Sequence, residues 1–397
     1  MTHIMPKQIG DYNKGKMLSV LRERGPTSRM ELSRLLGISP AAVTRNISHM
    51  LKNGIIRECG SEESDMGRKP VLIELCNDYC YLLGADIVGG ALKIAVADLM
   101  GTIIKYHEEP IIHINSASRG EVPRAQAVWD QLLSGLKKNF DEVTLTAQPP
   151  VPKEKIWVAV IGTPGIFNPD TGKSQFTFFL DGWDDIDIRT KIFNELSIET
   201  LIENDVNLDL VGESWKGVGR EYENILYVKL GQGLAARIVL QGKLLRGEHK
   251  MAGEIGYMLP GNSCGENVNY ENLICNDSVT KKYIELGGKE KALSIMDLCR
   301  LADNGDAAAC TVIDYMLEKF AVVLLNSAAV LDPQVIILGG DACYFREQDI
   351  NFLKKKIEQY LPLVQNIVPS KLNSKACLYG AIKTGLDRIE ERITDIW

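Results

Sequence analysis

Apolar residues recur at helical spacing through the first fifty positions of the chain and then change to the spacing of strands. In the first part they lie three or four positions apart, which predicts three short helices over 13–24, 28–36 and 40–52. From residue 55 onward they alternate with polar residues or run together in short stretches bounded by glycine, which predicts strands. We therefore expect a small helical module followed by a larger α/β body.

The residues between these three helices are typical of a helix-turn-helix. Ser28 and Glu31 form a capping box at the start of the second helix, in which hydroxyl and carboxylate each accept a bond from a backbone N–H. Gly37 can end that helix in the left-handed conformation. Ser39 can cap the third helix, and Pro40 fits its first position because the N–H that proline lacks has no partner there.

The third helix has an apolar and a polar face. Val43, Ile47, Met50 and Leu51 are predicted to point inward. The segments IIREC and PVLIEL follow as two strands around a polar tip, which completes a winged helix. We expect DNA contacts from the polar face and the wing, namely from Ser39, Thr44, Arg45, Ser48, His49, Lys52, Arg68 and Lys69.

Charge is divided unevenly along the chain, which favours a polyanion as partner of the N-terminal module. Residues 1–75 hold 12 Lys and Arg against 8 Asp and Glu, a charge of +4; the whole chain carries −7, so the remainder carries −11. Double-stranded operator DNA is the partner that a basic helix-turn-helix predicts. Glu62 and Glu63 weaken contact at the wing, and the alternative is a module whose charged face docks protein.

Composition places the chain among globular proteins. It has 397 residues, of which 45% are hydrophobic, enough for two or three packed domains. The apolar runs are too short to span a bilayer and the N-terminus lacks a hydrophobic signal region, so we expect a cytoplasmic protein without a membrane partner. Nine cysteines without a regular framework are expected to be reduced thiols.

Two stretches of the body share one layout of strand, glycine turn and strand. The first runs from Tyr81 through a turn at 88–90 to Asp98, and the second is LGQGLAARIVLQG. Such a repeat is expected of a fold built from two similar halves. Helices over 294–302 and 312–331 precede a buried strand, VIILGGD, and the last helix, YGAIKTGLDRI, is expected to pack back on the first half.

Amides and carboxylates gather in the middle of the chain. Glu203, Asn204 and Asp205 end a short apolar run, which places them at the C-terminal edge of a strand, where open α/β sheets bind ligands. Glu254 and Glu271 add two carboxylates downstream. Carboxylates accept hydrogen bonds from hydroxyls and an amide both donates and accepts, so the group suits a neutral polyhydroxylated ligand. The residues predict a carbohydrate site; solvated loop carboxylates are the alternative.

The order and spacing of these motifs resemble the ROK family of sugar kinases and sugar-responsive repressors. The resemblance runs from about Tyr81 to the C-terminus. The matching motifs are Glu203-Asn204-Asp205, LGQGLAARIVLQGKLLRG, Ala252-Gly253-Glu254-Ile255-Gly256, and Cys264-Gly265 before Glu271. The resemblance implies an α/β fold in which a winged helix-turn-helix precedes a two-lobe actin-like ATPase (ribonuclease H-like) sugar-kinase body. The expected domains are residues 1–78, residues 79–203 with 380–397, and residues 204–379, the last with a dimerisation surface.

The resemblance also implies roles for single residues. Asn204 would bond ring hydroxyls, Glu254 and Glu271 would hold the anomeric end, and Asp205 would be the general base of a kinase or only an acceptor in a repressor. The expected sugar-binding set is Asn204, Asp205, Glu254, Tyr257, Glu271 and Gly165. Tyr257 could instead be a packed core residue, and the loop at Gly165 an ordinary turn. Phe179 stands where the family usually has Asn, so we do not expect its commonest hexose bound in the usual way.

The chain departs from the kinases of the family in the turns that hold phosphate. Aligned on Asp86, where the kinases have Gly, Thr and Lys, it has Val88, Gly90 and Ala91. In the second turn Gln232 replaces Thr, and Arg237 would obstruct a nucleotide unless its side chain turns outward. We therefore expect no bound ATP.

The zinc site of the kinases is incomplete as well. Tyr257 replaces its His, Asn262 and Asn269 replace two of its three Cys, and Cys264 remains. Cys275 could join Cys264, but no third ligand stands near. We expect no zinc and no other cofactor, and the segment that zinc would order should be held by packing or be mobile until ligand binds.

These inferences together predict a sugar-responsive transcriptional regulator, a repressor of carbohydrate-utilisation genes. No catalytic residue is expected, and Asp205 would be a vestigial general base. The expected partners are operator DNA, a sugar or sugar derivative, and further copies of the chain in a homodimer or a dimer of dimers. The alternative is an ATP-dependent sugar kinase with a DNA-binding extension, which the retained Asp86 and Asp205 favour.

Overall fold

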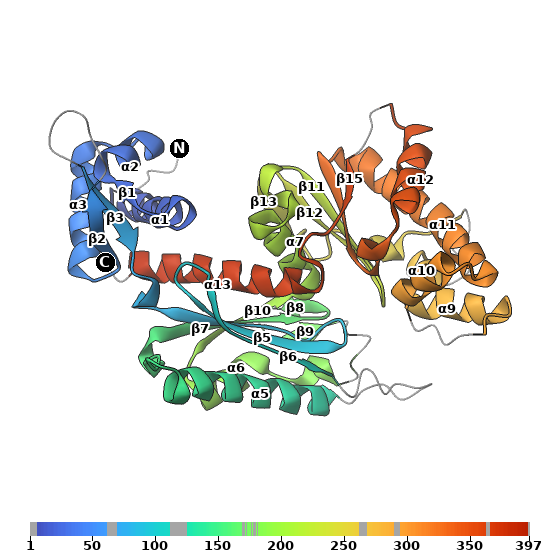
Figure 1. Cartoon of the computed structure of the whole chain (residues 1–397), viewed down its shortest axis with the longest axis horizontal. Helices are drawn as coiled ribbons and strands as arrows, with labels where there is room; N and C mark the ends of the chain where they lie inside the picture. The colour runs from blue at the N-terminus through green and yellow to red at the C-terminus, as the bar shows by residue number, and fades with distance from the viewer. Residues whose placement is uncertain are drawn as a thin grey trace. The chain divides into compact units, whose positions relative to one another are not determined.

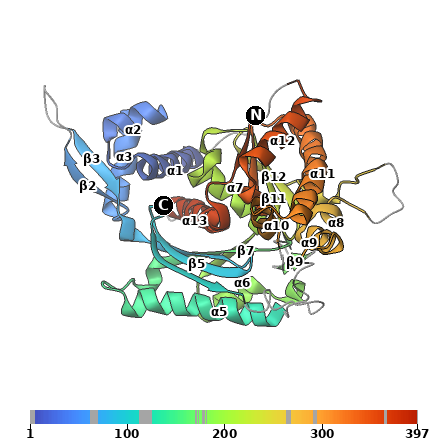
Figure 2. The ribbon, with the colours of Figure 1, turned by 45° about the vertical axis from the view of Figure 1, so that its right-hand side comes forward.

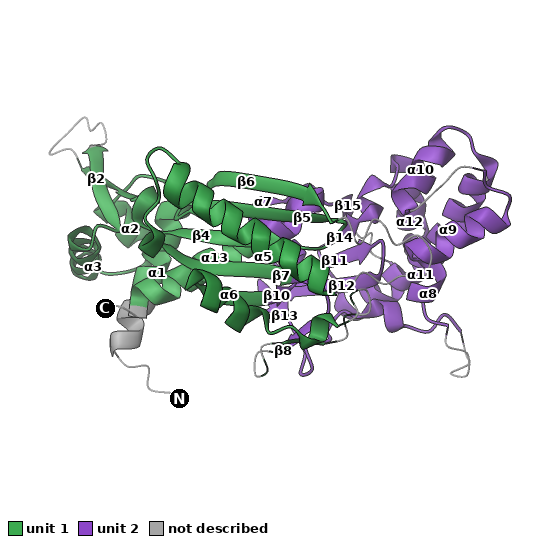
Figure 3. Cartoon of the chain, turned by 90° about the horizontal axis from the view of Figure 1, so that it is seen from below, with its two compact units in different colours: residues 1–162, 168–202, 381–397 green, residues 163–167, 203–380 purple. Residues whose placement is uncertain are grey.

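The computed structural model describes most of the chain. The described residues are 6–61, 70–111, 125–168, 171, 173–175, 177, 180, 182–261, 268–289, 294–362 and 366–395. They form two compact units, one of residues 1–162, 168–202 and 381–397, the other of residues 163–167 and 203–380 (Figure 3). Each unit is described separately below.

The N-terminal module, part of the first unit, has three helices and a three-stranded sheet, as the apolar spacing predicts (Figure 1). Its elements are α1 (Pro6–Arg24), β1 (Thr27–Ser28), α2 (Arg29–Leu36), α3 (Pro40–Lys52), β2 (Ile56–Ser61) and β3 (Val71–Leu75), with the strand order β1-β3-β2. α1 begins seven residues earlier than predicted, because Pro6 suits a first helical position and the next proline is Pro26.

The caps of α2 follow the prediction in part. The Ser28 hydroxyl accepts a bond from the Glu31 N–H at 3.3 Å, and Gly37 ends the helix in the left-handed conformation, with φ 64°. The second arm of the predicted capping box is replaced, since the Glu31 carboxylate accepts two bonds from Arg34 instead. An arginine one turn away is a stronger partner for this carboxylate than a neutral backbone N–H.

α3 begins as predicted, with the Ser39 hydroxyl accepting a bond from the Ala42 N–H. Three of its apolar residues are buried as predicted: Val43, Ile47 and Met50. Leu51 is only half-buried, and Asn46 is buried on the inner face in its place. At 3.6 residues per turn, positions 43, 46, 47 and 50 form one stripe, and position 51 lies about 100° beyond position 50.

A five-stranded sheet forms the body of the first unit. In the order β10-β7-β4-β5-β6, its strands are β10 (Glu199–Asn204), β7 (Ile156–Thr163), β4 (Tyr81–Asp86), β5 (Ala91–Asp98) and β6 (Ile103–Pro110). The helices α5 (Ala125–Asp141) and α6 (Ile188–Leu196) cover one face, and α13 (Ala376–Asp395) lies on the other (Figures 1 and 2). A two-stranded ribbon of β8 (Ile166–Asn168) and β9 (Lys173–Gln175) follows β7.

The second unit is built around a sheet of the same topology. In the order β13-β12-β11-β14-β15, its strands are β13 (Lys243–Leu245), β12 (Leu234–Leu240), β11 (Ile225–Leu230), β14 (Val335–Gly340) and β15 (Ile367–Pro369). In both sheets three antiparallel strands follow one another, and the fourth pairs in parallel with the first of the three. The predicted construction from two similar halves is therefore confirmed.

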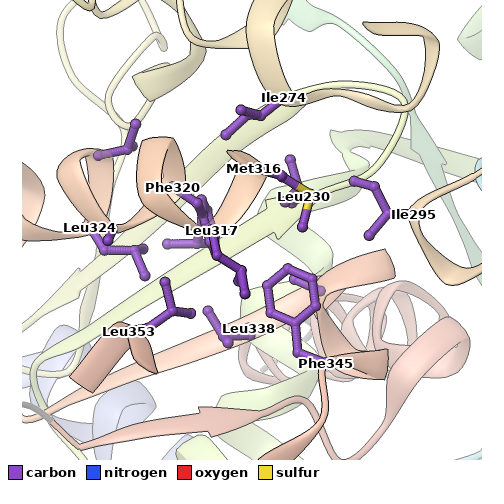
Figure 4. Close-up of a cluster of buried hydrophobic side chains, with 14 of the residues drawn as sticks. Leu230, Ile274, Ile295, Met316, Leu317, Phe320, Leu324, Leu338, Phe345 and Leu353 are labelled. Carbon is purple, nitrogen blue, oxygen red and sulfur yellow. The ribbon is translucent and has the colours of Figure 1, made fainter. Parts of the chain in front are cut away.

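The faces of this second sheet are covered by different helices. Ile225 and Tyr227 of β11 pack with Val206 of α7 (Asp205–Lys216). The residues between them, such as Leu226, face a larger core. That core is formed with α8 (Glu271–Ile274), α9 (Asn276–Glu285), α10 (Ile295–Asp303), α11 (Ala307–Leu331) and α12 (Glu347–Glu358). Figure 4 shows its centre, where Phe320 of α11 lies among apolar side chains from several elements.

The C-terminal helix α13 packs tightly on α7. A Cβ atom at Gly380 would lie 1.9 Å from the carbonyl oxygen of Leu208, and one at Gly212 would lie 2.1 Å from a carbonyl oxygen of α13, so only glycine fits at either position. Five residues after Gly380, Gly385 faces Leu82 and Val160 of the first sheet. The last helix thus returns to the first half, as predicted.

A buried ion pair joins α13 to the N-terminal module. Glu390 pairs with Arg22 of α1, and its other carboxylate oxygen accepts a bond from the Ser19 hydroxyl at 3.2 Å. Arg22 also donates from Nε to the carbonyl oxygen of Leu99 at 3.0 Å. The side chains of Arg22 and Glu390 are 6% and 13% exposed. Burial raises the pKa of Glu390, and the Arg22 guanidinium opposes that rise.

None of the helices in the described parts of the chain combines the length and the apolar character that a bilayer crossing requires.

Candidate functional site

The polar face of α3 is exposed as predicted. Thr44, Arg45, Ser48, His49 and Lys52 are all exposed, and so is Ser39 at the start of the helix. His49 contacts the side-chain amide of Asn53 through Nδ1, at 3.2 Å. Arg68 and Lys69, predicted to contact DNA from the wing, lie outside the described residues. The described surface therefore offers a helix of major-groove dimensions with a basic and polar outer face.

Asn204 stands where β10 ends and α7 begins, and its side chain holds that junction together. The Oδ1 atom accepts bonds from the N–H groups of Val206 and Asn207 at 3.0 and 3.1 Å, which caps the helix. The Nδ2 atom donates to the carbonyl oxygen of Gly165 at 2.8 Å. Two members of the predicted sugar-binding set, Asn204 and Gly165, are thus in direct contact.

Arg237 lies beside Asn204 and is 3% exposed. Its Nη2 atom donates to Asn204 Oδ1 at 3.2 Å and to Glu254 Oε1 at 2.8 Å, and its Nη1 atom donates to the carbonyl oxygen of Ala236. The side chain therefore points into the unit and does not turn outward, which was the condition under which it would leave a nucleotide unobstructed. The reason is electrostatic, since the guanidinium finds a carboxylate and an amide oxygen inside the unit.

Asp205 belongs to a second charged group, centred on Lys229 of β11. The Lys229 ammonium lies 2.8 Å from Asp205 Oδ2 and 2.7 Å from Asp209 Oδ2. The two aspartates are four residues apart on α7 and so share a face of that helix. Both are buried, at 5% and 4% exposed, and the ammonium balances part of their charge.

Glu203, the residue before this junction, is held by neighbours on both sides. Its Oε1 atom accepts a bond from Asn207 Nδ2 at 2.8 Å, and its Oε2 atom lies 2.6 Å from a guanidinium nitrogen of Arg246. We use the name strand-end cluster for the residues that these contacts join in the second unit. The cluster consists of Gly165, Glu203, Asn204, Asp205, Asn207, Asp209, Lys229, Arg237, Arg246 and Glu254.

Tyr257 lies near the carboxylates of Glu254 and Glu271. The Glu271 carboxylate accepts a bond from the Leu234 N–H at 3.0 Å, at the start of β12. Tyr257 is 50% exposed, which contradicts the alternative that it is a packed core residue. Partial burial and the nearby carboxylates of Glu271 and Glu254 raise the pKa of its hydroxyl, so that hydroxyl stays protonated and can donate at neutral pH.

The turns that correspond to the phosphate loops have other partners. Asp86 accepts a bond from the Val88 N–H at 3.0 Å, and its other oxygen lies 3.4 Å from the buried Lys93 ammonium. In the second turn the Gly231 N–H donates to the carbonyl oxygen of Gly233, and Gln232 is exposed. Both turns are thus held by internal bonds.

The region that would hold zinc in the kinases is described in part. Asn262 and Cys264 lie outside the described residues, as does Phe179. Asn269 accepts a bond from the Asn272 N–H, and Tyr270 next to it is 3% exposed, so packing holds the described end of this segment. Burial raises the pKa of the Cys275 thiol, which disfavours the thiolate that a metal ligand requires.

Three cations of the strand-end cluster were not assigned to a ligand site by sequence reasoning: Lys229, Arg237 and Arg246. A signal existed for Arg237, which interrupts the apolar run of β12, and for Lys229, which does the same in β11. The pair Asp205 and Asp209, at helical spacing, pointed to a cation opposite α7. With these residues, the cluster contains cationic hydrogen-bond donors as well as carboxylate and amide oxygens that can accept from hydroxyl groups.

Both the N-terminal module and the body of the chain match known protein families. Residues 118–385 match the ROK family, and residues 11–57 match the winged helix-turn-helix DNA-binding family. A xylose repressor from Caldicellulosiruptor bescii is 25% identical over 96% of each chain. A glucokinase from Halalkalibacterium halodurans is 28% identical over 72% of this chain and 87% of its own.

Among solved structures, a ROK family transcriptional regulator, described as a homologue of the Escherichia coli MLC protein, has the same fold. Its TM-score is 0.77 at 21% sequence identity, over 97% of this chain and 98% of its own. The strand-end cluster lies in the second unit, where residues at the end of β10 contact residues of β11 and β12, and the winged helix-turn-helix belongs to the first unit. The chain therefore belongs to the ROK family and carries an N-terminal winged helix-turn-helix domain.

Proposed function

We propose that this protein is a sugar-responsive transcriptional repressor that binds operator DNA through α3 and a sugar or sugar derivative at the strand-end cluster. The observation that carries the proposal is the presence, in one chain, of an exposed basic helix-turn-helix face and a buried set of amide and carboxylate groups at a strand end. Its relationship to a xylose repressor over 96% of both chains supports the same function.

The proposed mechanism couples ligand binding to the spacing of two recognition helices. Ligand hydroxyls would bond to Asn204, Asp205, Glu254 and Glu271, and the bound form would favour a different arrangement of a dimer. Because a dimeric repressor must match half-sites about one helical turn of DNA apart, a changed spacing lowers operator affinity. The ligand acts only through its different affinity for the two arrangements.

The test measures DNA binding directly. Operator fragments are first selected from genomic DNA with the full-length protein, and their affinity is then measured by fluorescence anisotropy at fixed salt, with and without each member of a sugar panel. We expect one sugar or sugar derivative to change operator affinity at least tenfold. Failure to select any DNA, or an affinity that no panel member changes, would contradict the proposal.

A kinase is the second candidate, and the retained Asp205 and Asp86 favour it. Against it, Lys229 and Lys93 engage these two carboxylates, and the turn after Asp86 has Val88 and Ala91 where phosphate-binding residues are expected. A catalytic base needs a free lone pair directed at the substrate hydroxyl, which the Lys229 ammonium occupies in part. ATP turnover coupled to phosphorylation of any sugar in the panel would establish the kinase.

A further inference from the structure

The position of Arg237 bears on the chemical class of the ligand. Its side chain is 3% exposed and joins two predicted sugar-binding residues, Asn204 and Glu254, from a central position in the sheet. A ligand that bonds to both Asn204 and Glu254 must either share these residues with the Arg237 guanidinium or break the contact between Glu254 and Arg237. The geometry of the three residues indicates which of them can move.

Arg237 is fixed by its surroundings. Its backbone pairs with Tyr227 in the ladder between β12 and β11, and its guanidinium is also bonded to the carbonyl oxygen of Ala236. Asn204 is equally fixed, because its amide caps α7 and donates to Gly165. Neither residue can leave its place without breaking backbone contacts.

Glu254 is the least constrained of the three. Its side chain is 22% exposed, and it follows Gly253, which has φ 93° and lies against the carbonyl oxygen of Ala236. One bond, from Arg237 Nη2 to Oε1, holds its carboxylate to the guanidinium. A ligand that enters the cluster would therefore displace Glu254 toward solvent and leave Arg237 in place.

Charge balance decides what can replace Glu254. A neutral sugar in its place leaves a buried guanidinium without a counter-charge, which is strongly unfavourable. A ligand carrying a carboxylate or a phosphate restores the charge that Glu254 had supplied, and a planar or tetrahedral anion can accept two parallel bonds from the guanidinium where Glu254 accepts one.

We propose that the effector is an anionic monosaccharide, a sugar acid or a sugar phosphate, whose acidic group replaces Glu254 on Arg237. Its hydroxyl groups bond to the amide of Asn204 and to the carboxylate of Asp205. Arg237 is then the residue that determines ligand specificity in this chain. This inference rests on the proposed function, adds the ligand class to it, and makes Arg237 in place of Glu254 the residue that contacts the ligand.

The experiment compares neutral sugars with their anionic derivatives on the same carbon skeleton. Full-length protein is titrated calorimetrically with glucose, gluconate, glucuronate and glucose 6-phosphate, and with the corresponding pentose and amino-sugar sets. We expect at least one acid or phosphate to bind at least tenfold more tightly than its neutral parent. The carboxylate and phosphate arms distinguish the two sources of the negative charge.

Three variants test the part played by Arg237. Arg237→Met should abolish the preference for the anion. Glu254→Gln, a partly exposed position, should raise anion affinity severalfold because the competing carboxylate is gone, and it serves if Arg237→Met fails to fold. Lys243→Met, at an exposed position of β13, removes a positive charge outside the cluster and should change nothing.

The outcomes separate this inference from the proposed function. A neutral sugar that binds as tightly as its acid and changes operator affinity would overturn the inference and leave the proposed function standing. Anion binding that survives in Arg237→Met, or that falls in Glu254→Gln, would also overturn it. If no sugar of either kind binds or changes operator affinity, the proposed function fails and the inference fails with it.

Discussion

Removing Arg22 should leave the buried Glu390 carboxylate without its cation, and the resulting loss of folding stability should depend on pH. In Arg22→Met the side-chain volume is nearly kept, while Glu390, 13% exposed, loses its cation and retains the Ser19 hydroxyl. Breaking a buried ion pair by removing one partner costs about 3–5 kcal/mol of stability. The lost bond from Arg22 to the Leu99 carbonyl oxygen adds about 1 kcal/mol. We expect unit 1, and α1 first, to be destabilised by that amount at pH 7.5.

The sign of the pH dependence follows from the Glu390 pKa. Burial already raises it above its ordinary value, and without the opposing guanidinium it rises further. A carboxyl group whose folded pKa is raised contributes stability below its unfolded pKa of about 4.3, and that contribution is lost as pH rises through the folded pKa. Relative to wild type, Arg22→Met should therefore recover stability as pH falls from 7.5 toward 5.

The assay is urea denaturation followed by circular dichroism, with hydrogen exchange of residues 6–24 as a local measure. Adding Glu390→Gln to Arg22→Met should restore most of the stability, because the amide carries no charge. Arg388→Met on the same helix is the control, since its pair with Glu199 is about one-third exposed on each side and is worth about 0–1 kcal/mol. A loss for Arg22→Met that is independent of pH, or that Glu390→Gln deepens, would refute the reasoning.

Three further predictions test separate parts of the molecule. Asn204→Ala should lower the free energy of unfolding by about 1–2 kcal/mol in urea denaturation, because α7 loses its cap; a neutral result would mean that the cap is dispensable. Gly380→Ala should lower the melting temperature, because its Cβ would lie 1.9 Å from the Leu208 oxygen, whereas Gly15→Ala in α1, with nothing within 4 Å, should raise stability by about 0.5–1 kcal/mol; equal effects would contradict the packing argument. Arg45→Ala should weaken operator binding and reduce the slope of log affinity against log salt by about 1 if it contacts phosphate, and an unchanged affinity would place the DNA elsewhere.

Local structure was predictable where neighbouring residues decide it. The cap of α3 depends on Ser39 and on a backbone N–H three residues away, and the end of α2 depends on the freedom of Gly37 to adopt φ 64°. The hairpins of both sheets follow from alternation and glycine in the same way. Where a second local partner competes, the prediction fails, as when Glu31 bonds to Arg34 rather than to the backbone of Ser28.

The candidate site was predictable in its acceptors and not in its cations. Asn204 and Glu254 belong to motifs whose order and spacing along the chain identify them as candidate site residues. Arg237 bonds to residues 33 positions before it and 17 after it, and the choice between an outward and an inward side chain depends on where the sheet places those partners. Lys229 and its aspartates are likewise brought together only by the packing of β11 on α7.

The return of α13 to the first sheet has a consequence for the order of events during synthesis. Residues 203–380 can complete their sheet and its covering helices as soon as they leave the ribosome. The first sheet cannot, because the helix that covers one of its faces, with Gly385 against Leu82 and Val160, follows every other described element in the chain. Until then Arg22 also lacks Glu390. The N-terminal module, although it is translated first, is thus among the last parts of the chain to gain all of its contacts.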